Sequence, residues 1–175
     1  MLKAGPTWRT RGQAFDHQGN TEIAQIFIFR GEDSIFYFQF LYAEDGGNKL
    51  VLSEKIGSSS AIGSNSLDTV TLDYPSEFVT GVSGKYRQNR SFNSPTKLRS
   101  ITFHTNKTKY GPFEARPIRT QQFPPESEME FSYDVGLSKL CGFFGTYLSD
   151  GIETIGIYLK PIEKLPINAV KKKGM

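Results

Sequence analysis

The stretch over residues 142–159 constrains the fold of this chain more than any other. An aromatic run over 142–148 leads into a short polar loop at 149–151, and apolar side chains then recur at every second position. In that second run Ile155, Ile157 and Leu159 fall on one face. Alternation with a period of two predicts a strand, so the stretch predicts two strands joined by a polar loop. Rigid arms that present a loop are a common way to build a binding site.

The rest of the chain repeats this pattern of short strands and turns. Glycine (17 residues) and phenylalanine (14 residues) are frequent, and long amphipathic helical windows are missing. Strands are expected over 23–29, 34–42, 49–53, 68–73, 78–86, 98–105 and 129–133, and loops or turns over 5–20, 57–66, 87–96 and 106–114. About ten to twelve short strands with regular turns predict an all-β domain, as a sandwich, barrel or prism. A length of 175 residues suits one domain.

The composition limits the cellular compartment and the kinds of binding partner that can be expected. The single cysteine, Cys141, lies in an apolar run and is expected to be a buried small hydrophobe. The first residues show no apolar leader, and no apolar run is long enough to span a bilayer, so a cytoplasmic or nuclear location is expected. The net charge is +3, and three lysines at 171–173 carry much of it. We expect residues 162–175 to form an extended basic tail.

Catalytic and metal motifs are missing from the sequence. His17 and His104 lie on different segments, away from any metal-ligand spacing. The sequence shows neither a phosphate-binding loop before a helix nor a nucleophile elbow. Aromatic and basic residues are not interleaved as a nucleic-acid platform requires. We therefore predict no catalytic residue, no metal, no cofactor and no nucleic-acid partner.

The polar loop near residue 150 offers chemistry that suits a sugar. Sugar hydroxyls need carboxylate acceptors and backbone N–H donors, which Asp150, Glu153 and the backbone of Gly151 and Ile152 can supply. The alternative is that Asp150 and Gly151 form an ordinary hairpin turn and Glu153 faces solvent. Spacing alone favours this alternative, because Asp-Gly is a strong hairpin signal.

Several longer motifs resemble the jacalin-related lectins of plants, in the order found in that family. They are Gly5-Pro6, Phe15-Asp16, LDYPSEFVTGVSGKY at 72–86, LRSITFHTNK at 98–107, YGPF at 110–113, GFFG at 142–145 and IGIYL at 155–159. Together they cover residues 5 to 161.

The resemblance implies a β-prism of three four-stranded antiparallel sheets that binds sugar at one end. It implies a jacalin-type lectin domain over 1–161, followed by the basic tail. A single uncleaved chain looks more like the mannose- or glucose-binding branch than the galactose-binding one. The carbohydrate-binding residues carried over by the resemblance are Gly12, Gly84, Lys85, Tyr86, Asp150, Gly151, Ile152 and Glu153.

The chain departs from the family pattern where sugar would bind. Of the usual paired glycines near the N-terminus only Gly12 matches, Glu153 stands in the place of an aspartate, and the closing loop has room for one extra residue. The first hypothesis is therefore a carbohydrate-binding lectin of the mannose/glucose class with weak or altered affinity. The second is a lectin-fold protein-interaction module in plant defence, similar to short members linked to restriction of virus movement. A third is a module for an acidic ligand at Arg9 and Arg11. Homo-oligomers and protein partners fit all three.

Overall fold

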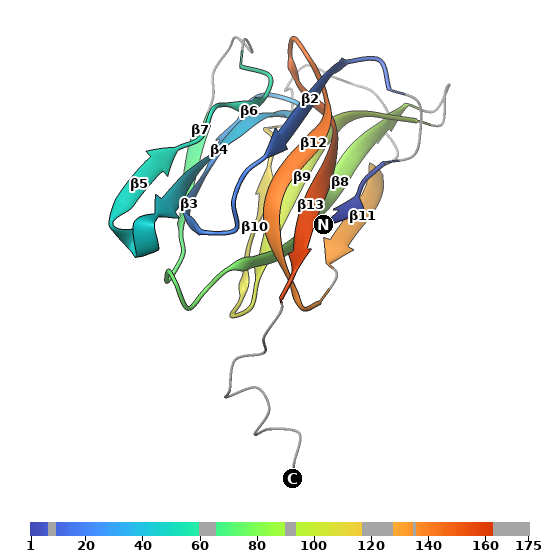
Figure 1. The fold of residues 1–175 in the computed structure, drawn as a ribbon. Coiled ribbons are helices and arrows are strands. Elements are labelled where there is room, and N and C mark those ends of the chain that lie inside the picture. Colours follow the sequence, from blue (N-terminus) through green and yellow to red (C-terminus); the bar gives the residue numbers. More distant parts are fainter. Residues whose placement is uncertain (7–9, 60–65, 90–93, 117–127, 135, 163–175) are drawn as a thin grey trace.

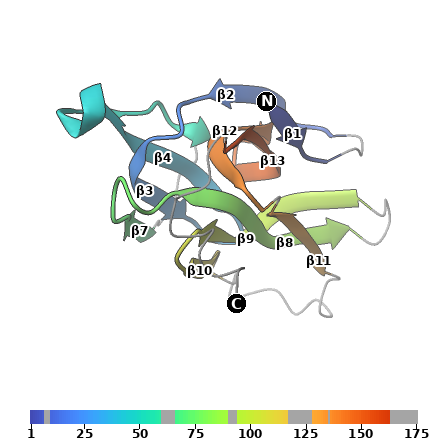
Figure 2. The same cartoon turned by 60° about the horizontal axis from the view of Figure 1, so that its bottom comes forward.

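The protein consists almost entirely of β-strands. The computed structural model describes residues 1–6, 10–59, 66–89, 94–116, 128–134 and 136–162. Within these residues, thirteen strands and one short 3-10 helix, η1 (Asp45–Gly47), follow one another along the chain. The named strands form three antiparallel sheets, which lie on three sides of a common core (Figures 1 and 2).

Each sheet combines strands that are distant in sequence. The first sheet has the order β1 (Leu2–Ala4), β13 (Gly151–Pro161), β12 (Ser138–Leu148), β2 (Gln13–Gln18). The second has the order β10 (Lys109–Glu114), β9 (Ser94–Thr105), β8 (Val79–Asn89), β11 (Glu128–Asp134). The third has the order β5 (Lys49–Leu52), β4 (Ile35–Glu44), β3 (Ile23–Arg30), β7 (Ser66–Thr71), and β6 (Ile56–Gly57) also pairs with β4.

The strand β6 does not widen the third sheet. Val51 of β5 lies opposite Tyr42, and Gly57 of β6 lies opposite Tyr37, so both strands occupy the same edge of β4 at successive positions. Each sheet is thus four strands across. The predicted β-prism of three four-stranded antiparallel sheets is confirmed.

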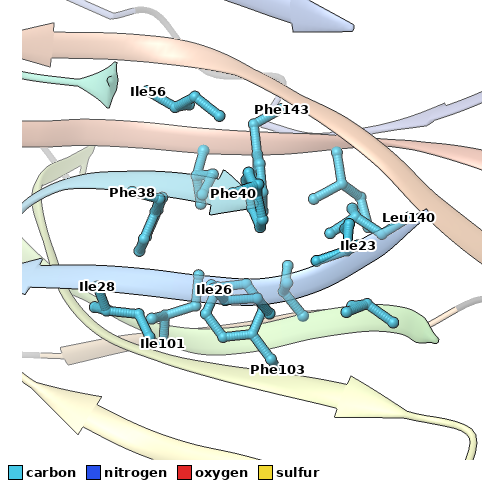
Figure 3. Packing of buried hydrophobic residues seen from close by; sticks show 14 of the residues in the cluster. Ile23, Ile26, Ile28, Phe38, Phe40, Ile56, Ile101, Phe103, Leu140 and Phe143 are labelled. Atoms are coloured by element: carbon cyan, nitrogen blue, oxygen red, sulfur yellow. The ribbon is translucent and has the colours of Figure 1, made fainter. Parts of the chain in front are cut away.

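Alternate residues of the three sheets meet in one core. Phe143 of the first sheet stacks on Phe38 and Phe40 of the third, with ring centroids 5.7 and 5.4 Å apart. Phe103 of the second sheet meets Phe38 edge-to-face at 5.9 Å (Figure 3). The predicted inward face of β13 is confirmed, since Ile155, Ile157 and Leu159 are fully buried. Burying an apolar side chain of this size contributes about 1.5–3 kcal/mol, so the shared core holds the sheets together.

Two strands lie where the sequence pattern predicted loops. Residues 13–18 form β2, which pairs with β12, and residues 109–114 form β10, which pairs with β9 across a bulge. Both are edge strands, where polar residues and proline are tolerated because one side of the strand is unpaired. Strands β8 and β9 also extend into the loop predicted over 87–96. The predicted tail, from residue 163 onward, lies outside the described residues.

Candidate functional site

The hairpin of β12 and β13 closes the first sheet with a tight turn, and neighbouring loops hold this turn in place. Leu148 pairs with Gly151, so Ser149 and Asp150 form the turn. The Ser34 hydroxyl donates to the Asp150 carbonyl at 2.6 Å, and the Ser58 hydroxyl donates to the Ser149 carbonyl at 3.3 Å. Both serines follow strands of the third sheet, so the turn is fixed at the junction of two sheets.

Gly151 is needed at this turn for two reasons. Its φ is +147°, a conformation that residues with side chains rarely adopt. A Cβ atom at this position would also lie 1.9 Å from the Ser34 Oγ atom. The neighbouring Ile152 is fully buried in the core, and Gly151 is buried as well, so neither of these two site candidates presents an exposed group at the surface.

Glu153 occupies a β-bulge directly after the turn. Thr146 pairs with Thr154 and Tyr147 pairs with Ile152, which leaves Glu153 as the extra residue of β13. A bulge of this kind re-aims the side chain of the extra residue. The Glu153 side chain turns inward and the residue is only 3% exposed. The prediction of a solvent-facing Glu153 is therefore wrong.

The Glu153 carboxylate contacts the loop between β1 and β2. Its Oε1 atom accepts a hydrogen bond from the backbone N–H of Arg11 at 2.7 Å. Its Oε2 atom is buried and has no hydrogen-bond partner among the residues that the structure describes. A Cβ atom on Gly12 would lie 2.7 Å from this Oε2 and 2.5 Å from the Tyr147 carbonyl oxygen. Only glycine allows the backbone to approach the carboxylate so closely.

Asp150 belongs to a charged network that joins all three sheets. Its carboxylate is half exposed and lies 2.6 Å from the Lys97 Nζ atom. Lys97 also contacts Asp33 at 3.1 Å, and Asp33 further binds Arg87 at 2.6 Å and Arg99 at 2.5 Å. Burial works to lower the pKa of Lys97, but the two carboxylates outweigh it, so this pKa is raised and the lysine stays charged.

The predicted site residues of β8 lie apart from the turn. Tyr86 is fully buried, and its hydroxyl donates to the Ile155 carbonyl at 3.1 Å and accepts from the Ile155 N–H at 3.0 Å. Burial raises the pKa of Tyr86, which keeps this hydroxyl protonated. The side chain therefore links β8 to β13 and offers no surface to a ligand.

Lys85 faces the outside of the second sheet, and the neighbouring Gly84, which lies opposite the core residue Ile101, contributes to the same surface. They line a groove of about 480 Å³ together with hydroxyl side chains and one aromatic ring: Ser83, Ser100, Thr102, Pro112, Glu130, Phe131 and Ser132. The Lys85 Nζ atom lies 3.4 Å from a Glu128 carboxylate oxygen. The structure thus brings Gly12, Asp150, Gly151, Ile152 and Glu153 together, and it places Gly84, Lys85 and Tyr86 along β8.

Sequence reasoning missed the residues that hold the turn. Ser34, Ser58, Asp33 and Lys97 come from loops and strands of the other two sheets. No local pattern marks these residues, because their contacts join segments that are far apart in the sequence.

The histidine and cysteine side chains of the described residues lie apart from one another. No cluster of three or more possible metal ligands occurs among them. His104 lies 2.6 Å from the Ser83 hydroxyl, and His17 lies 3.3 Å from the Tyr42 hydroxyl on other strands. Cys141 is buried, and burial raises the pKa of its thiol. In the described parts of the chain, no helix is long and apolar enough to cross a membrane.

A β-prism of three four-stranded antiparallel sheets is the fold of a class of sugar-binding proteins, the β-prism lectins. Residues 4–158 match the family described as the Jacalin-like lectin domain. The chain therefore belongs to the jacalin-like lectin family, whose members bind carbohydrate and are not enzymes.

Known relatives and solved structures agree with this assignment. Protein RESTRICTED TEV MOVEMENT 1 of Arabidopsis thaliana is 39% identical over 145 residues, which cover 82% of this chain and 75% of that protein. The structure of single-chain recombinant jacalin matches with a TM-score of 0.68 and 27% identity, over 91% of this chain and 93% of that one. A mannose-specific jacalin-related lectin from Morus nigra, in complex with mannose, matches with a TM-score of 0.66 and 26% identity, over 91% and 94% of the two chains.

Proposed function

We propose that this lectin domain binds glycans of the mannose/glucose class at the end of the prism formed by the β12–β13 turn, with weak affinity. The observation that carries the proposal is the buried Glu153 Oε2 atom, which has no hydrogen-bond partner among the described residues. A buried acceptor left without a donor costs about 1–3 kcal/mol. A sugar hydroxyl is a donor of suitable size for this atom.

Weak affinity follows from the way the carboxylate is held. One oxygen already accepts the Arg11 N–H, and residues 11 and 12 cover the other. A sugar reaches Oε2 only when this loop moves aside, so only a fraction of molecules is competent to bind. The apparent affinity is reduced by that fraction. Asp150, which is already paired with Lys97, supplies a second hydrogen-bond acceptor at the exposed edge of the proposed sugar site.

The similarity to the Morus nigra lectin supports the choice of sugar, since that protein is mannose-specific and its structure holds mannose. Tyr86 is left out of the proposed site because its hydroxyl is used inside the protein. Gly84 and Lys85 are also left out, because they face the groove of the second sheet. The location proposed for this activity is the cytoplasm or the nucleus, which cell fractionation tests.

Titration with mannose and glucose oligosaccharides in a calorimeter tests the proposal. Glu153→Gln keeps the shape of the side chain and removes its charge. A hydrogen bond to a charged group contributes about 1.5–3 kcal/mol, so affinity should fall by about 10- to 100-fold. Glu128→Gln is the matched control and should change affinity by about threefold or less, because this half-exposed carboxylate pairs with Lys85 on the second sheet, away from the turn. Absence of binding to any glycan at high protein concentration, or equal binding by Glu153→Gln, would contradict the proposal.

A second candidate function is a protein-interaction module in plant defence, such as restriction of virus movement. Glu153 is only 3% exposed, and one of its oxygens already accepts the Arg11 N–H. This enclosure favours the second candidate, because a sugar site that has lost its role would look the same. The 39% identity to Protein RESTRICTED TEV MOVEMENT 1 supports the same candidate. Under this function, Glu153→Gln leaves virus movement in a plant assay unchanged, whereas under the lectin function it impairs any glycan-dependent effect.

A further inference from the structure

A serine, a histidine and an aspartate from three neighbouring strands lie in a row on the second sheet. The Ser83 hydroxyl of β8 is 2.6 Å from the Nε2 atom of His104 on β9. The Nδ1 atom of the same ring is 3.5 Å from a carboxylate oxygen of Asp134 on β11. The three strands lie side by side in the order β9, β8, β11 (Figure 2). Hydroxyl, imidazole and carboxylate in this order are the groups that activate a nucleophilic serine.

Strand register explains how residues of three strands meet. Gly81 of β8 lies opposite both His104 on β9 and Asp134 on β11. Because glycine has no side chain, nothing on β8 separates the imidazole from the carboxylate. Ser83 follows two positions along the same strand, so its hydroxyl is on the same side of the sheet. The row of three side chains is therefore held in place by the pairing of the strands.

The surroundings of His104 favour the protonation state that a base needs. The residue is only 8% exposed, and burial lowers the pKa of its imidazole. The charge of Asp134 offsets part of this effect, and Lys109 on β10 adds to it, so the ring is neutral at about pH 7. The carboxylate beside Nδ1 favours the proton on that nitrogen, which leaves Nε2 to accept the Ser83 O–H.

Ser83 borders a groove that can hold a small molecule. The residue is half-buried and lines the groove of about 480 Å³ on the second sheet. Small-molecule sites commonly enclose roughly 300–1,000 Å³. Pro112 and Phe131 contribute apolar lining, and Thr102 offers a hydroxyl directly opposite Ser83. A short, uncharged acyl group matches this mixture of apolar and hydroxyl lining.

We propose that Ser83 is a nucleophilic serine that takes an acyl group from a small activated carboxylic ester. The Ser83 oxygen forms a bond to the carbonyl carbon of the ester, and the bond from that carbon to the leaving oxygen breaks. His104 accepts the serine proton and passes it to the departing oxygen. The products are acylated Ser83 and a free alcohol or phenol, so the step balances without a further reactant.

The acyl group stays on the serine, because the sheet does little to assist a second step. β8 is paired on both sides, so its backbone N–H groups are used between strands and cannot form an oxyanion hole. A missing donor of this kind slows acyl transfer by about 10²- to 10³-fold. Only a reactive ester therefore acylates Ser83, and the less reactive serine ester hydrolyses more slowly. The reaction modifies the protein once without turnover, which agrees with a non-enzymatic family.

The proposed modification goes beyond the proposed function and does not depend on it. Its residues belong to β8, β9 and β11 of the second sheet, whereas the candidate sugar site belongs to the β12–β13 hairpin of the first sheet and the loop before β2. Failure of either proposal therefore leaves the other standing.

Incubation with p-nitrophenyl acetate, followed by peptide mass spectrometry, tests the proposal. The wild type should release about one equivalent of nitrophenol and carry an acetyl group on Ser83. His104→Gln removes the base and should slow labelling by about 100-fold or more. Ser132→Ala is the matched control, because Ser132 lines the same groove directly opposite Ser83 and has no hydrogen bond to a histidine among the described residues. This control should change the rate by about twofold or less.

The pH dependence separates activation by His104 from ordinary ester chemistry. Labelling should be level above about pH 7, where the ring is neutral, and should fall at lower pH as protonation removes the base. A serine that reacts without a base would instead label about tenfold faster with each added pH unit. Asp134→Asn should move the fall to lower pH, because this carboxylate raises the pKa of His104. A merely structural role of Asp134 would leave the pH profile in place.

Three results would overturn the proposal. They are a wild type without an acetyl group on Ser83 at millimolar ester, labelling of His104→Gln at the wild-type rate, and a rate that rises steadily with pH. Hydroxylamine removes an acetyl ester from serine and leaves an acetyl amide on lysine, so labelling of Lys85 alone would be recognised and would also refute the proposal. Because the peptide map and the pH profile use the wild type, the proposal can be refuted even if a variant does not fold.

Discussion

Replacing Asp33 by asparagine should destabilise the fold far more than a typical surface change. The Asp33 side chain is 7% exposed, and three cations converge on its two oxygens: Arg87, Lys97 and Arg99 at 2.6, 3.1 and 2.5 Å. Its φ is +68°, which asparagine tolerates better than most residues. Asp33→Asn therefore removes the charge without adding backbone strain.

The size of the loss follows from the three contacts. A hydrogen bond between charged groups contributes roughly 1–1.5 kcal/mol more than a neutral one. Three such contacts give a loss of about 3–4.5 kcal/mol, in line with the roughly 3–5 kcal/mol found when one partner of a buried pair is removed. For a domain of this length, the melting temperature should fall by about 6–18 °C.

Thermal and urea unfolding, followed by circular dichroism, measure this loss. Asp68→Asn is the matched control, because Asp68 also pairs with an arginine, Arg30, but both side chains are about a quarter exposed. A single exposed pair contributes about 1 kcal/mol or less. If the two variants lose equal stability, or if Asp33→Asn loses less than about 1 kcal/mol, the assignment of Asp33 as the buried hub of the charged network is wrong.

Three further changes probe the turn, the link from β8 to β13, and the buried histidine of the second sheet. Tyr86→Phe removes both hydrogen bonds to Ile155 and should cost about 1–3 kcal/mol in urea unfolding. Gly151→Ala forces a Cβ against Ser34 in a conformation unfavourable for alanine, and should cost more than about 2 kcal/mol by the same assay. Burial lowers the pKa of His104 in the folded protein, and the charge of Asp134 only partly offsets this effect. The unfolded chain therefore binds the proton more readily than the folded protein does. Stability should therefore fall as pH drops below about 6.5, and His104→Gln should flatten this slope in urea titrations.

Most strands could be predicted because their apolar residues alternate between core and solvent. The alternation over Ile155 to Leu159 located β13, since each inward residue is fully buried. β10 was missed because Gly111 and Pro112 resemble a turn, whereas the structure places them at the bulge of an edge strand. Proline is tolerated there because its missing N–H faces away from the sheet.

The candidate site was only partly predictable from sequence. Asp150 and Gly151 were found because a tight turn needs these residue types locally. The contact between Arg11 and Glu153 could not be predicted, because the Arg11 N–H belongs to a loop 142 residues away in sequence. Tyr86 resembled a ligand residue next to a polar loop, yet strand alternation turns its ring into the core. Contacts between sheets depend on how the prism closes, and no local pattern encodes them.

The first sheet pairs the domain's earliest strand with its latest, since Leu2 lies opposite Leu159. A ribosome delivers β1 and β2 long before β12 and β13 exist. The second and third sheets are built from intervening residues and have all their strands earlier. The sheet that carries the candidate sugar site therefore forms last during synthesis. Until then Phe143 and its neighbours do not cover the inward side of the other two sheets. A chaperone would protect the nascent chain during this interval.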